Sequence, residues 1–391
     1  MVTGRQPSVL VAHPGAELYG SDRVMLSTVS ALVGAGYRVT VAVPSDGPLL
    51  AEIRKRGAAA EIIAAPVLRK RLLSPTGLLS LVAQMPAALA RAVAAIRRMD
   101  IDTVYVSTLT IPSWLLAARL AGRTVICHVH EAERSPRPLV KRALATPLLL
   151  TDAIAANSAF CASVLAEPYP TLARRTTVVL NAVAGPPTAT PPREGLGSRV
   201  RLVYVGRLSE RKGVDLAVDA AEILWARGRA VTLDLVGGVF DGYEPFRSAL
   251  EEKVERSDLG DAVRFLGFRP SVWEELASAD IALVPSRADE SFGNAVVEAV
   301  LAERPVIVSD SSGLREAAAG YDTTVLVPLG DAAAIADAVE RIADDWASYR
   351  AAAAAARAEA ERRHARERYD AAILAVIETA DQQRPHDGGQ I

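Results

Sequence analysis

Residues 284–316 constrain this chain more than any other stretch, because they spell one strand–loop–helix–strand unit. An apolar run at 281–284 predicts a strand that ends at Pro285, and the polar loop behind it leads into a helix with Asn294 as its N-cap. A second short strand follows at 305–308. A helix that begins in a glycine-containing loop directs backbone N–H groups and its positive dipole end to one point, so we expect a phosphate site there.

Two carboxylates accompany this helix start, Glu290 in the loop and Glu298 inside the helix. A carboxylate next to a bound phosphate is electrostatically unfavourable unless it accepts hydrogen bonds from hydroxyl groups. Hydroxyl groups beside a phosphate are a feature of sugars and of ribose. The unit therefore predicts a binding site for a nucleotide sugar.

Strand and helix patterns alternate along both halves of the chain, and this rhythm is typical of parallel, doubly wound sheets. Between the halves, four prolines fall within residues 186–192, and such a run continues neither a helix nor a strand. We therefore predict two Rossmann-like α/β domains, 1–184 and 199–361, that face each other across a cleft and are joined by a linker at 185–198.

Residues 351–360, at the end of the second domain, are rich in alanine, and glutamate then alternates with arginine through residue 368. This pattern favours a solvated helix over a basic interaction arm, because its charges are mixed. We expect the later part of this helix, about 362–380, to join the first domain. Residues 381–391 are expected to form a flexible tail.

Composition narrows the class of protein. Lys and Arg total 44 against 46 Asp and Glu among 391 residues, which argues against a nucleic-acid partner. The only cysteines, Cys127 and Cys161, lie in apolar stretches, as in proteins of a reducing compartment. The N-terminus runs into a strand pattern without the apolar segment of a signal peptide. We expect a cytoplasmic α/β protein.

One uncharged segment, 72–90, tests this expectation, since its length alone would allow a membrane span. Pro75 and Pro86 interrupt it, which favours a helix that covers the sheet, as is usual in doubly wound folds. The basic run 69–71 precedes the segment. Cations beside apolar surface also suit peripheral contact with an anionic bilayer, so docking at the inner face of the cell membrane remains the alternative.

A second phosphate-seeking loop, 206–213, follows the first strand of the second half. Glycines bound it, and it contains Arg207, whose planar fork suits a diphosphate, and Lys212, a point charge. A solvated basic turn would look similar. The ligand interpretation is favoured because the helix start at 291–294 should open at the same carboxyl edge of the same sheet, where α/β proteins bind ligands.

The first half offers a glycine loop and a histidine pair. Gly15 and Gly20 are five residues apart, which excludes the dinucleotide fingerprint but still lets backbone approach a phosphate. His128 and His130 should share one face of a strand, since they flank a single residue. A metal site would need Glu131 or other neighbours as further ligands, and one histidine alone fits a core position; His130, nearest the strand end, is the better candidate for substrate.

Five motifs of the second half carry a resemblance to the retaining glycosyltransferases of family 4. They are VGRLSERKG (205–213), FLGF (265–268), ADIALVPS (279–286), ESFGNAVVEA (290–299) with the family's E-x7-E spacing, and RPVIVSDSSGLRE (304–316). In the first half, YGSDRVM (19–25) is similar to the family's Gly-Gly-Ala-Glu opening and departs from it at Tyr19. Either Gly15 or Gly20 could therefore be the glycine that approaches the donor.

The resemblance implies a GT-B fold, with the acceptor on the first domain and a nucleotide-sugar donor on the second. It implies no cofactor and no metal; the close pair Asp100 and Asp102 precedes a strand, at the opposite edge from the donor loops. It also assigns roles. Those implied are Arg207, Lys212, Gly15, Gly20, Phe292, Gly293 and Asn294 for the diphosphate, Glu298 for the ribose, Gly267 and Phe268 for the nucleobase, and His130 with Glu290 at the transferring sugar.

These expectations describe a hexosyltransferase-type enzyme that moves a sugar, with retention, to a glycan, lipid or small-molecule acceptor, as in cell-envelope glycan biosynthesis. Two alternatives stay open. A sugar-nucleotide epimerase of similar build would need more acid–base residues around the sugar than His130 and the glutamates. A non-catalytic nucleotide-sugar-binding subunit is disfavoured, because Arg207, Lys212, Glu290, Glu298 and His130 are all present.

Overall fold

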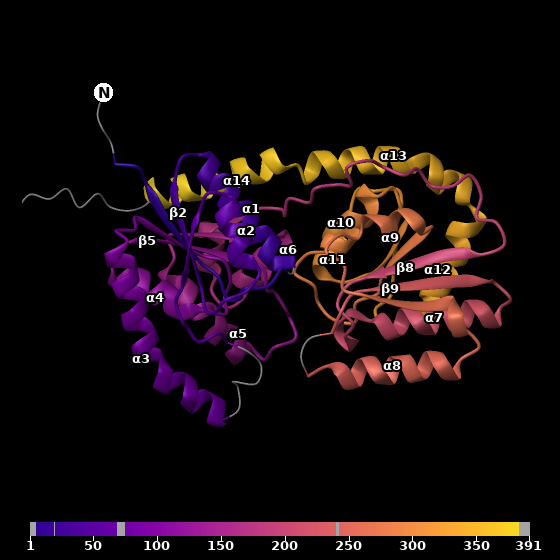
Figure 1. Cartoon of the computed structure of the whole chain (residues 1–391), viewed down its shortest axis with the longest axis horizontal. Helices are drawn as coiled ribbons and strands as arrows, with labels where there is room; N and C mark the ends of the chain where they lie inside the picture. Colours follow the sequence, from indigo (N-terminus) through magenta and orange to yellow (C-terminus); the bar gives the residue numbers. More distant parts are fainter. Residues whose placement is uncertain (1–4, 19, 69–74, 240–241, 383–391) are drawn as a thin grey trace, which may run out of the picture. The chain divides into compact units, whose positions relative to one another are not determined.

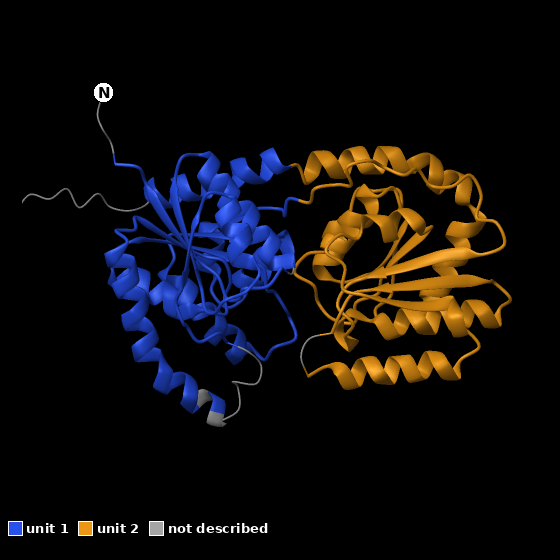
Figure 2. Cartoon of the chain, in the orientation of Figure 1, with its two compact units in different colours: residues 1–182, 366–391 blue, residues 183–365 orange. Residues whose placement is uncertain are grey.

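The computed structural model describes residues 5–18, 20–68, 75–239 and 242–382 (Figure 1). The chain divides into two compact units (Figure 2). Unit 1 comprises residues 1–182 and 366–391, and unit 2 comprises residues 183–365.

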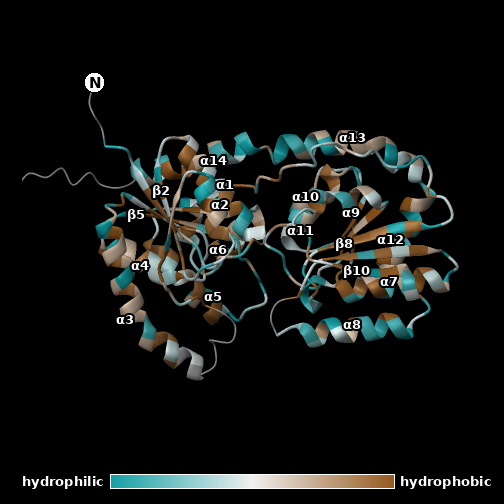
Figure 3. Cartoon of the chain, in the orientation of Figure 1, coloured by the Kyte–Doolittle hydropathy of each residue, from teal (hydrophilic) through white to brown (hydrophobic). Residues whose placement is uncertain are grey.

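Among its described residues, unit 1 contains a seven-stranded parallel sheet in the order β3-β2-β1-β4-β5-β6-β7. Its central strands are short apolar runs buried on both faces, as expected where helices cover a parallel sheet (Figure 3). The strands are β1 Ser8–Ala12, β2 Arg38–Val43, β3 Ala59–Ile62, β4 Thr103–Val106, β5 Thr124–Val129, β6 Ala153–Ala156 and β7 Thr176–Val178.

Side chains of β1 alternate between the two cores of unit 1. Val9 and Val11 join the core formed with α1, α2 and α14, whereas Leu10 and Ala12 join the core formed with α3, α4 and α6. The helices are α1 Gly20–Gly34, α2 Leu49–Lys55, α3 Pro75–Arg98, α4 Pro112–Leu120, α5 Pro138–Ala145, α6 Ala159–Ala166 and α14 Arg366–Gln382.

Unit 2 repeats the architecture with a six-stranded parallel sheet in the order β10-β9-β8-β11-β12-β13. In both sheets the first strand, β1 or β8, lies where the strand order reverses, and ligands bind at the carboxyl ends beside such a point. The strands are β8 Val200–Val205, β9 Val231–Val236, β10 Val263–Gly267, β11 Ile281–Val284, β12 Val306–Ser309 and β13 Thr324–Val327. The helices are α7 Val214–Ala226, α8 Glu244–Arg256, α9 Trp273–Ser278, α10 Asn294–Leu301, α11 Ser312–Ala318, α12 Ala332–Asp344 and α13 Trp346–Arg363.

The proline-rich segment 185–198 belongs to unit 2 and is fixed to it by side chains. Arg304 is buried and donates to the carbonyl oxygen of Thr190 at 2.9 Å. The indole of Trp346 donates to the carbonyl of Arg193 at 3.0 Å, and the guanidinium of Arg193 pairs with buried Asp280 at 2.6 Å. Prolines remove backbone donors from this segment, so carbonyl oxygens and side chains attach it instead.

The C-terminal helical region is interrupted where it passes from one unit to the other. Helix α13 ends at Arg363 and α14 begins at Arg366 in unit 1. Buried Tyr369 anchors α14, because its hydroxyl lies 2.6 Å from Oγ1 of Thr28 on α1. Helix α14 reaches Gln382, two residues into the segment that the sequence assigned to a tail, and residues 383–391 lie outside the described residues.

Candidate functional site

The loops after β8 and β11 meet at the carboxyl edge of the unit 2 sheet, as the sequence predicted. Gly213 ends the first loop with a left-handed φ of 66°, and a Cβ there would lie 1.9 Å from the carbonyl oxygen of Pro285. Only glycine satisfies both conditions. The backbone amide of Arg287 also donates to the carbonyl of Arg211 at 2.9 Å, so the two loops form one continuous ledge.

An ion pair joins the two loops through side chains. Lys212 Nζ lies 2.8 Å from Glu290 Oε2, and the hydroxyl of Ser286 donates to Glu290 Oε1 at 3.2 Å. The Lys212 side chain is 29% exposed and that of Glu290 is 13% exposed, so the pair remains accessible from solvent on the lysine side. The structure thus brings the residue expected at the diphosphate together with the residue expected at the sugar.

Helix α10 begins next to this pair, and its N-cap is Gly293 rather than Asn294. Asn294 already has helical geometry, whereas Gly293 has an extended φ of −156°, which corrects the predicted N-cap by one residue. A Cβ at Gly293 would lie 2.8 Å from Leu314 Cδ2 and 3.1 Å from Ala317 Cβ, so a larger residue would require side chains of α11 to shift. As a glycine, the N-cap residue itself has no side chain to accept from the first amides of the helix, which suits an anion as their partner.

Two further residues of this motif fall into different environments. Phe292 is buried, and its ring packs against His364 with centroids 5.6 Å apart. Its backbone is therefore the part that a ligand can reach. Glu298 is half-buried one turn along α10 from Asn294, on the same helix face.

The ledge continues across the ends of β9 and β10. The amide of Gly237 donates to the carbonyl of Gly267 at 2.9 Å, and a Cβ on Gly237 would lie 1.8 Å from the carbonyl oxygen of Gly206. Phe268 follows at the end of β10 with 53% of its surface exposed. An exposed phenyl ring at this edge can stack on a planar base.

Arg207 is exposed on this ledge directly after Gly206. Its backbone is held by the hydroxyl of buried Tyr204, which donates to the Arg207 carbonyl at 2.7 Å. Burial raises the pKa of Tyr204 well above its usual value, so this hydroxyl stays a donor.

Unit 1 places His128 and His130 on one face, as predicted, with ring centroids 3.9 Å apart. His128 is buried, and its Nδ1 lies 2.6 Å from the hydroxyl of Tyr105, which makes it a core histidine. His130 is less buried as a residue, although its Nε2 is enclosed and has no hydrogen-bond partner among the described residues. Burial lowers the pKa of His130 to about 3, with repulsion from His13 as the second cause, so the ring is neutral at physiological pH.

A buried polar cluster that sequence reasoning missed lies beside His130. His13 Nδ1 is 2.6 Å from Ser107 Oγ, and His13 Nε2 is 2.7 Å from Asp22 Oδ1. These residues come from the ends of β1 and β4 and from the first turn of α1. The cluster fixes both ends of the glycine loop, because Gly15 lies between His13 and Asp22 and Gly20 begins α1. The sequence feature that could have indicated this cluster is a histidine that precedes a proline at the end of a strand.

Carboxylates at other places do not add a metal centre to these edges. Among the described residues, no group of three or more His, Cys, Asp or Glu side chains is placed to hold a metal ion. Asp102 accepts hydrogen bonds from the amide and hydroxyl of Ser8 at 2.9 and 2.7 Å. It therefore lies at the amino edge of the sheet, opposite the glycine loop, as predicted.

Two family models match the chain, and each covers one half. The model described as "Glycosyltransferase Family 4" matches residues 19–184, and the model described as "Glycosyl transferases group 1" matches residues 192–359. Both halves of the chain are therefore similar to glycosyltransferases.

Curated relatives agree with the family models. The amylovoran biosynthesis glycosyltransferase AmsK of Erwinia amylovora is 32% identical over 43% of this chain and 42% of its own length. A 2-deoxystreptamine glucosyltransferase of Streptomyces kanamyceticus is 30% identical over 72% of this chain and 77% of its own length. The chain spans about two fifths of the length of the first curated relatives that it matches.

Solved structures show the same fold along nearly the whole chain. Anabaena Alr3699/HepE, solved in complex with UDP-glucose, superimposes with a TM-score of 0.79 at 20% sequence identity. The superposition covers 95% of this chain and 99% of that one. At this identity the likeness extends to the fold alone.

Proposed function

This chain belongs to the family 4 glycosyltransferases with the GT-B fold, and we propose that it transfers a hexosyl group, with retention, from a nucleoside diphosphate sugar to an acceptor hydroxyl. The observation that carries the proposal is the continuous ledge of unit 2. It combines the Lys212–Glu290 pair, the start of α10 with glycine as its N-cap and the exposed ring of Phe268. Phosphate, sugar and base would each find a suitable partner on this ledge.

The reaction asks the protein chiefly to stabilise the leaving diphosphate. Arg207, Lys212 and the N-terminus of α10 would supply positive charge where negative charge develops. These groups do the work that a metal ion would otherwise do, so we propose a metal-independent enzyme without a cofactor. Gly15 and Gly20 would let the backbone of unit 1 approach a phosphate.

We propose retention through a front-face reaction, in which the leaving phosphate oxygen accepts the proton of the acceptor hydroxyl. Such a reaction needs no carboxylate nucleophile of the glycosidase type. His130, kept neutral by burial, would hydrogen-bond the transferring sugar, and Glu290 would accept hydrogen bonds from its hydroxyl groups. Glu298 would hold the ribose diol.

The names of the relatives indicate several different classes of acceptor. Their names include a 2-deoxystreptamine glucosyltransferase, a phosphatidyl-myo-inositol mannosyltransferase and an amylovoran biosynthesis enzyme. We propose an acceptor hydroxyl on a glycan, a lipid or an aminocyclitol-like small molecule. The reaction is proposed to take place in the cytoplasm, at the inner membrane face if the acceptor is lipid-linked.

A donor screen tests this proposal. Thermal shift with UDP-, GDP- and ADP-sugars should reveal one donor that raises the melting temperature, and that donor should be hydrolysed slowly or transferred to an added acceptor. NMR of the products separates the alternatives: an epimerised donor indicates an epimerase, and binding without turnover indicates a non-catalytic subunit. Lys212→Ala serves as the control that should lose donor binding. Absence of binding to every donor would contradict the proposal.

A further inference from the structure

The two halves of helix α3 differ in how far their side chains are buried. Its later half packs on the sheet of unit 1 through buried residues such as Ala88, Ala92 and Ile96. Its earlier half exposes large apolar side chains, with 74% of Leu79 and 65% of Val82 accessible to solvent. The prediction of an ordinary sheet-covering helix therefore holds for the second half of α3 only.

By length and composition alone, residues Leu79–Arg98 could cross a membrane, with a mean hydropathy of 1.6 and 22% of the segment buried. The fold argues for a different placement. Ala92 and Ile96 belong to the core that also contains Leu10 and Val104, so a crossing helix would have to leave this core. A helix attached along one side and apolar on the other lies in the plane of an interface rather than across it.

The exposed apolar residues of α3 share one face. Exposed Leu79, Val82 and Pro86 and partly buried Val93 follow one another at intervals of three, four and seven residues, which places them in a stripe along the helix. A shallow pocket of about 620 Å³ opens on this stripe and is lined in part by Pro86, Val93 and by Leu120 of α4. We call Leu79, Val82, Pro86, Leu89, Val93 and Leu120 the α3 face.

The charges of α3 indicate what covers this face. The helix contains Arg91, Arg97 and Arg98 and no acidic residue. Arg97 lines the same pocket and forms no ion pair with the described residues. Arg98 pairs with Glu61, but a second copy of this chain on the α3 face would bring Arg97 of each copy, which lacks such a pair among the described residues, into one interface, and this is unfavourable. A surface that is both apolar and anionic would complement the exposed apolar side chains and the arginines of α3.

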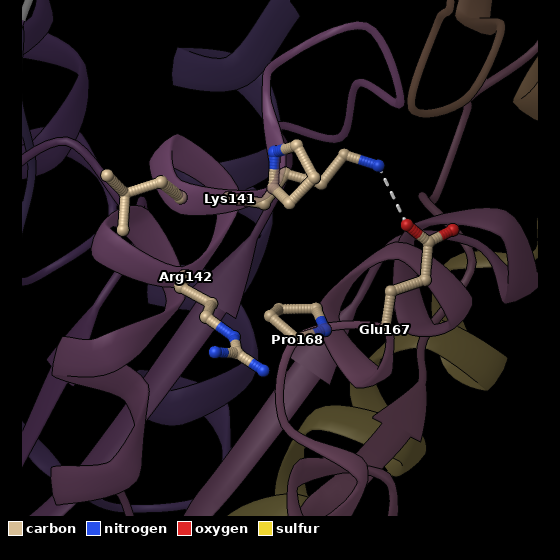
Figure 4. Close-up of a pocket in the computed structure, with 6 residues that line it drawn as sticks. Lys141, Arg142, Glu167 and Pro168 are labelled. Carbon is tan, nitrogen blue, oxygen red and sulfur yellow. Dashed lines mark hydrogen bonds and ion pairs between the residues drawn. The ribbon is translucent and has the colours of Figure 1, made fainter.

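Helix α5, also in unit 1, likewise has an exposed apolar side chain next to cations. Leu139 is 79% exposed on it, and a pocket of about 500 Å³ opens beside this residue. Figure 4 shows Lys141 reaching Glu167, at 2.8 Å, whereas Arg142 is directed elsewhere. Arg142 forms no ion pair within the described part of the chain. Apolar side chains beside unpaired cations thus recur on unit 1.

We propose that the α3 face docks on an anionic lipid bilayer, with Leu79 and Val82 in the interface and Arg97 near the lipid headgroups. Docking would give the proposed transferase access to a lipid-linked acceptor, and only this consequence rests on the proposed function. The binding itself needs apolar burial and attraction between arginine and anionic lipid. The basic run 69–71 lies outside the described residues, so the test uses residues of α3.

Vesicle flotation of the full chain tests the docking. We expect co-flotation with vesicles of phosphatidylcholine mixed with phosphatidylglycerol, reversed by high salt, and little co-flotation with phosphatidylcholine alone. Leu79→Ser/Val82→Ser should lower the partition coefficient by roughly tenfold or more, since two large apolar side chains are lost. Arg97→Gln should lower it by about fivefold.

A matched control removes two exposed leucines from unit 2, Leu326→Ser/Leu329→Ser, and should float like the unchanged protein. Equal flotation of the two double variants would overturn the proposal, as would protein that stays at the bottom with both lipids. A dimer in analytical ultracentrifugation that Leu79→Ser/Val82→Ser dissociates would instead identify a contact between copies. Melting temperature and donor binding of this variant should stay unchanged. If the unchanged protein binds a donor but does not float with anionic vesicles, docking alone is refuted. If it floats but binds no donor, the transferase proposal alone is refuted.

Discussion

Replacing Lys212 by alanine gives the sharpest test of the ledge in unit 2. A charge-assisted hydrogen bond from a lysine to a phosphate contributes about 1.5–3 kcal/mol to binding. In the unliganded protein, however, Lys212 already pairs with Glu290 at 2.8 Å. A pair with this degree of exposure is worth about 0.2–1 kcal/mol, and part of it is given up when the diphosphate arrives. The net loss on Lys212→Ala is therefore about 1–2.5 kcal/mol.

This loss corresponds to a dissociation constant that rises about fivefold to seventyfold. Isothermal titration calorimetry with the free nucleoside diphosphate measures it directly. Arg207→Ala should show a loss of similar size, because its guanidinium is exposed on the same ledge. Lys253→Ala is the matched control, since Lys253 pairs with Asp219 between α7 and α8, and it should leave the affinity unchanged.

The double variant Lys212→Ala/Glu290→Gln separates attraction from repulsion. Lys212→Ala removes the nearer cation of Glu290 and leaves Arg211 at 3.9 Å, so repulsion between this carboxylate and a phosphate at the proposed site increases. Neutralising Glu290 removes that repulsion, and the double variant should bind the nucleoside diphosphate more tightly than Lys212→Ala alone. The reasoning is refuted if Lys212→Ala binds as tightly as the unchanged protein, or if adding Glu290→Gln weakens binding further.

Three further predictions address the remaining roles. Glu298→Gln should weaken nucleotide binding, whereas Glu290→Gln should lower turnover more than nucleotide affinity; identical effects on calorimetry and kinetics would contradict the distinct roles. The pKa of His130 is depressed to about 3 in the folded protein. The neutral ring therefore makes its full contribution to folding stability at pH values above the unfolded-state pKa of about 6.5, and this contribution is lost as pH falls toward 3. At pH 5.5 this loss amounts to about 1.4 kcal/mol, and urea unfolding of His130→Gln between pH 7.5 and 5.5 should lack it; an unchanged acid dependence would refute the assignment. Arg304→Lys should destabilise unit 2 by roughly 2–4 kcal/mol in urea, because one ammonium cannot reach the carbonyls that its guanidinium contacts; a loss no greater than that of exposed Arg256→Lys would speak against this.

Local patterns predicted the strands and loops of unit 2 closely. The expected strand at 281–284 is β11, and the loop 206–213 lies where the alternation placed it. These features depend on neighbouring residues, so sequence periodicity records them. The His13–Asp22–Ser107 cluster was missed for the opposite reason. Ser107 lies 94 residues from His13, and only the neighbouring positions of β1 and β4 bring the two together.

The error at the start of α10 has a local cause. Asn294 is a favoured N-cap residue by composition, and Gly293 is only a weaker candidate. The close approach of Leu314 and Ala317 on α11 favours a residue without a side chain at the position before the helix. Tertiary packing therefore moved the cap by one residue, and it removed the side chain that would otherwise have satisfied the first amides.

We propose that Glu290 lets the cationic ledge discriminate between anions. While the site is empty, Glu290 neutralises Lys212, and Ser286 holds the carboxylate in place. A bare phosphate must separate the pair and then remains next to a carboxylate, which costs binding energy. A donor that carries a sugar separates the same pair but offers hydroxyl groups to the released carboxylate, and these restore its hydrogen bonds. The pair therefore favours a phosphate that brings its own hydroxyl donors, which is the chemistry of a nucleotide sugar.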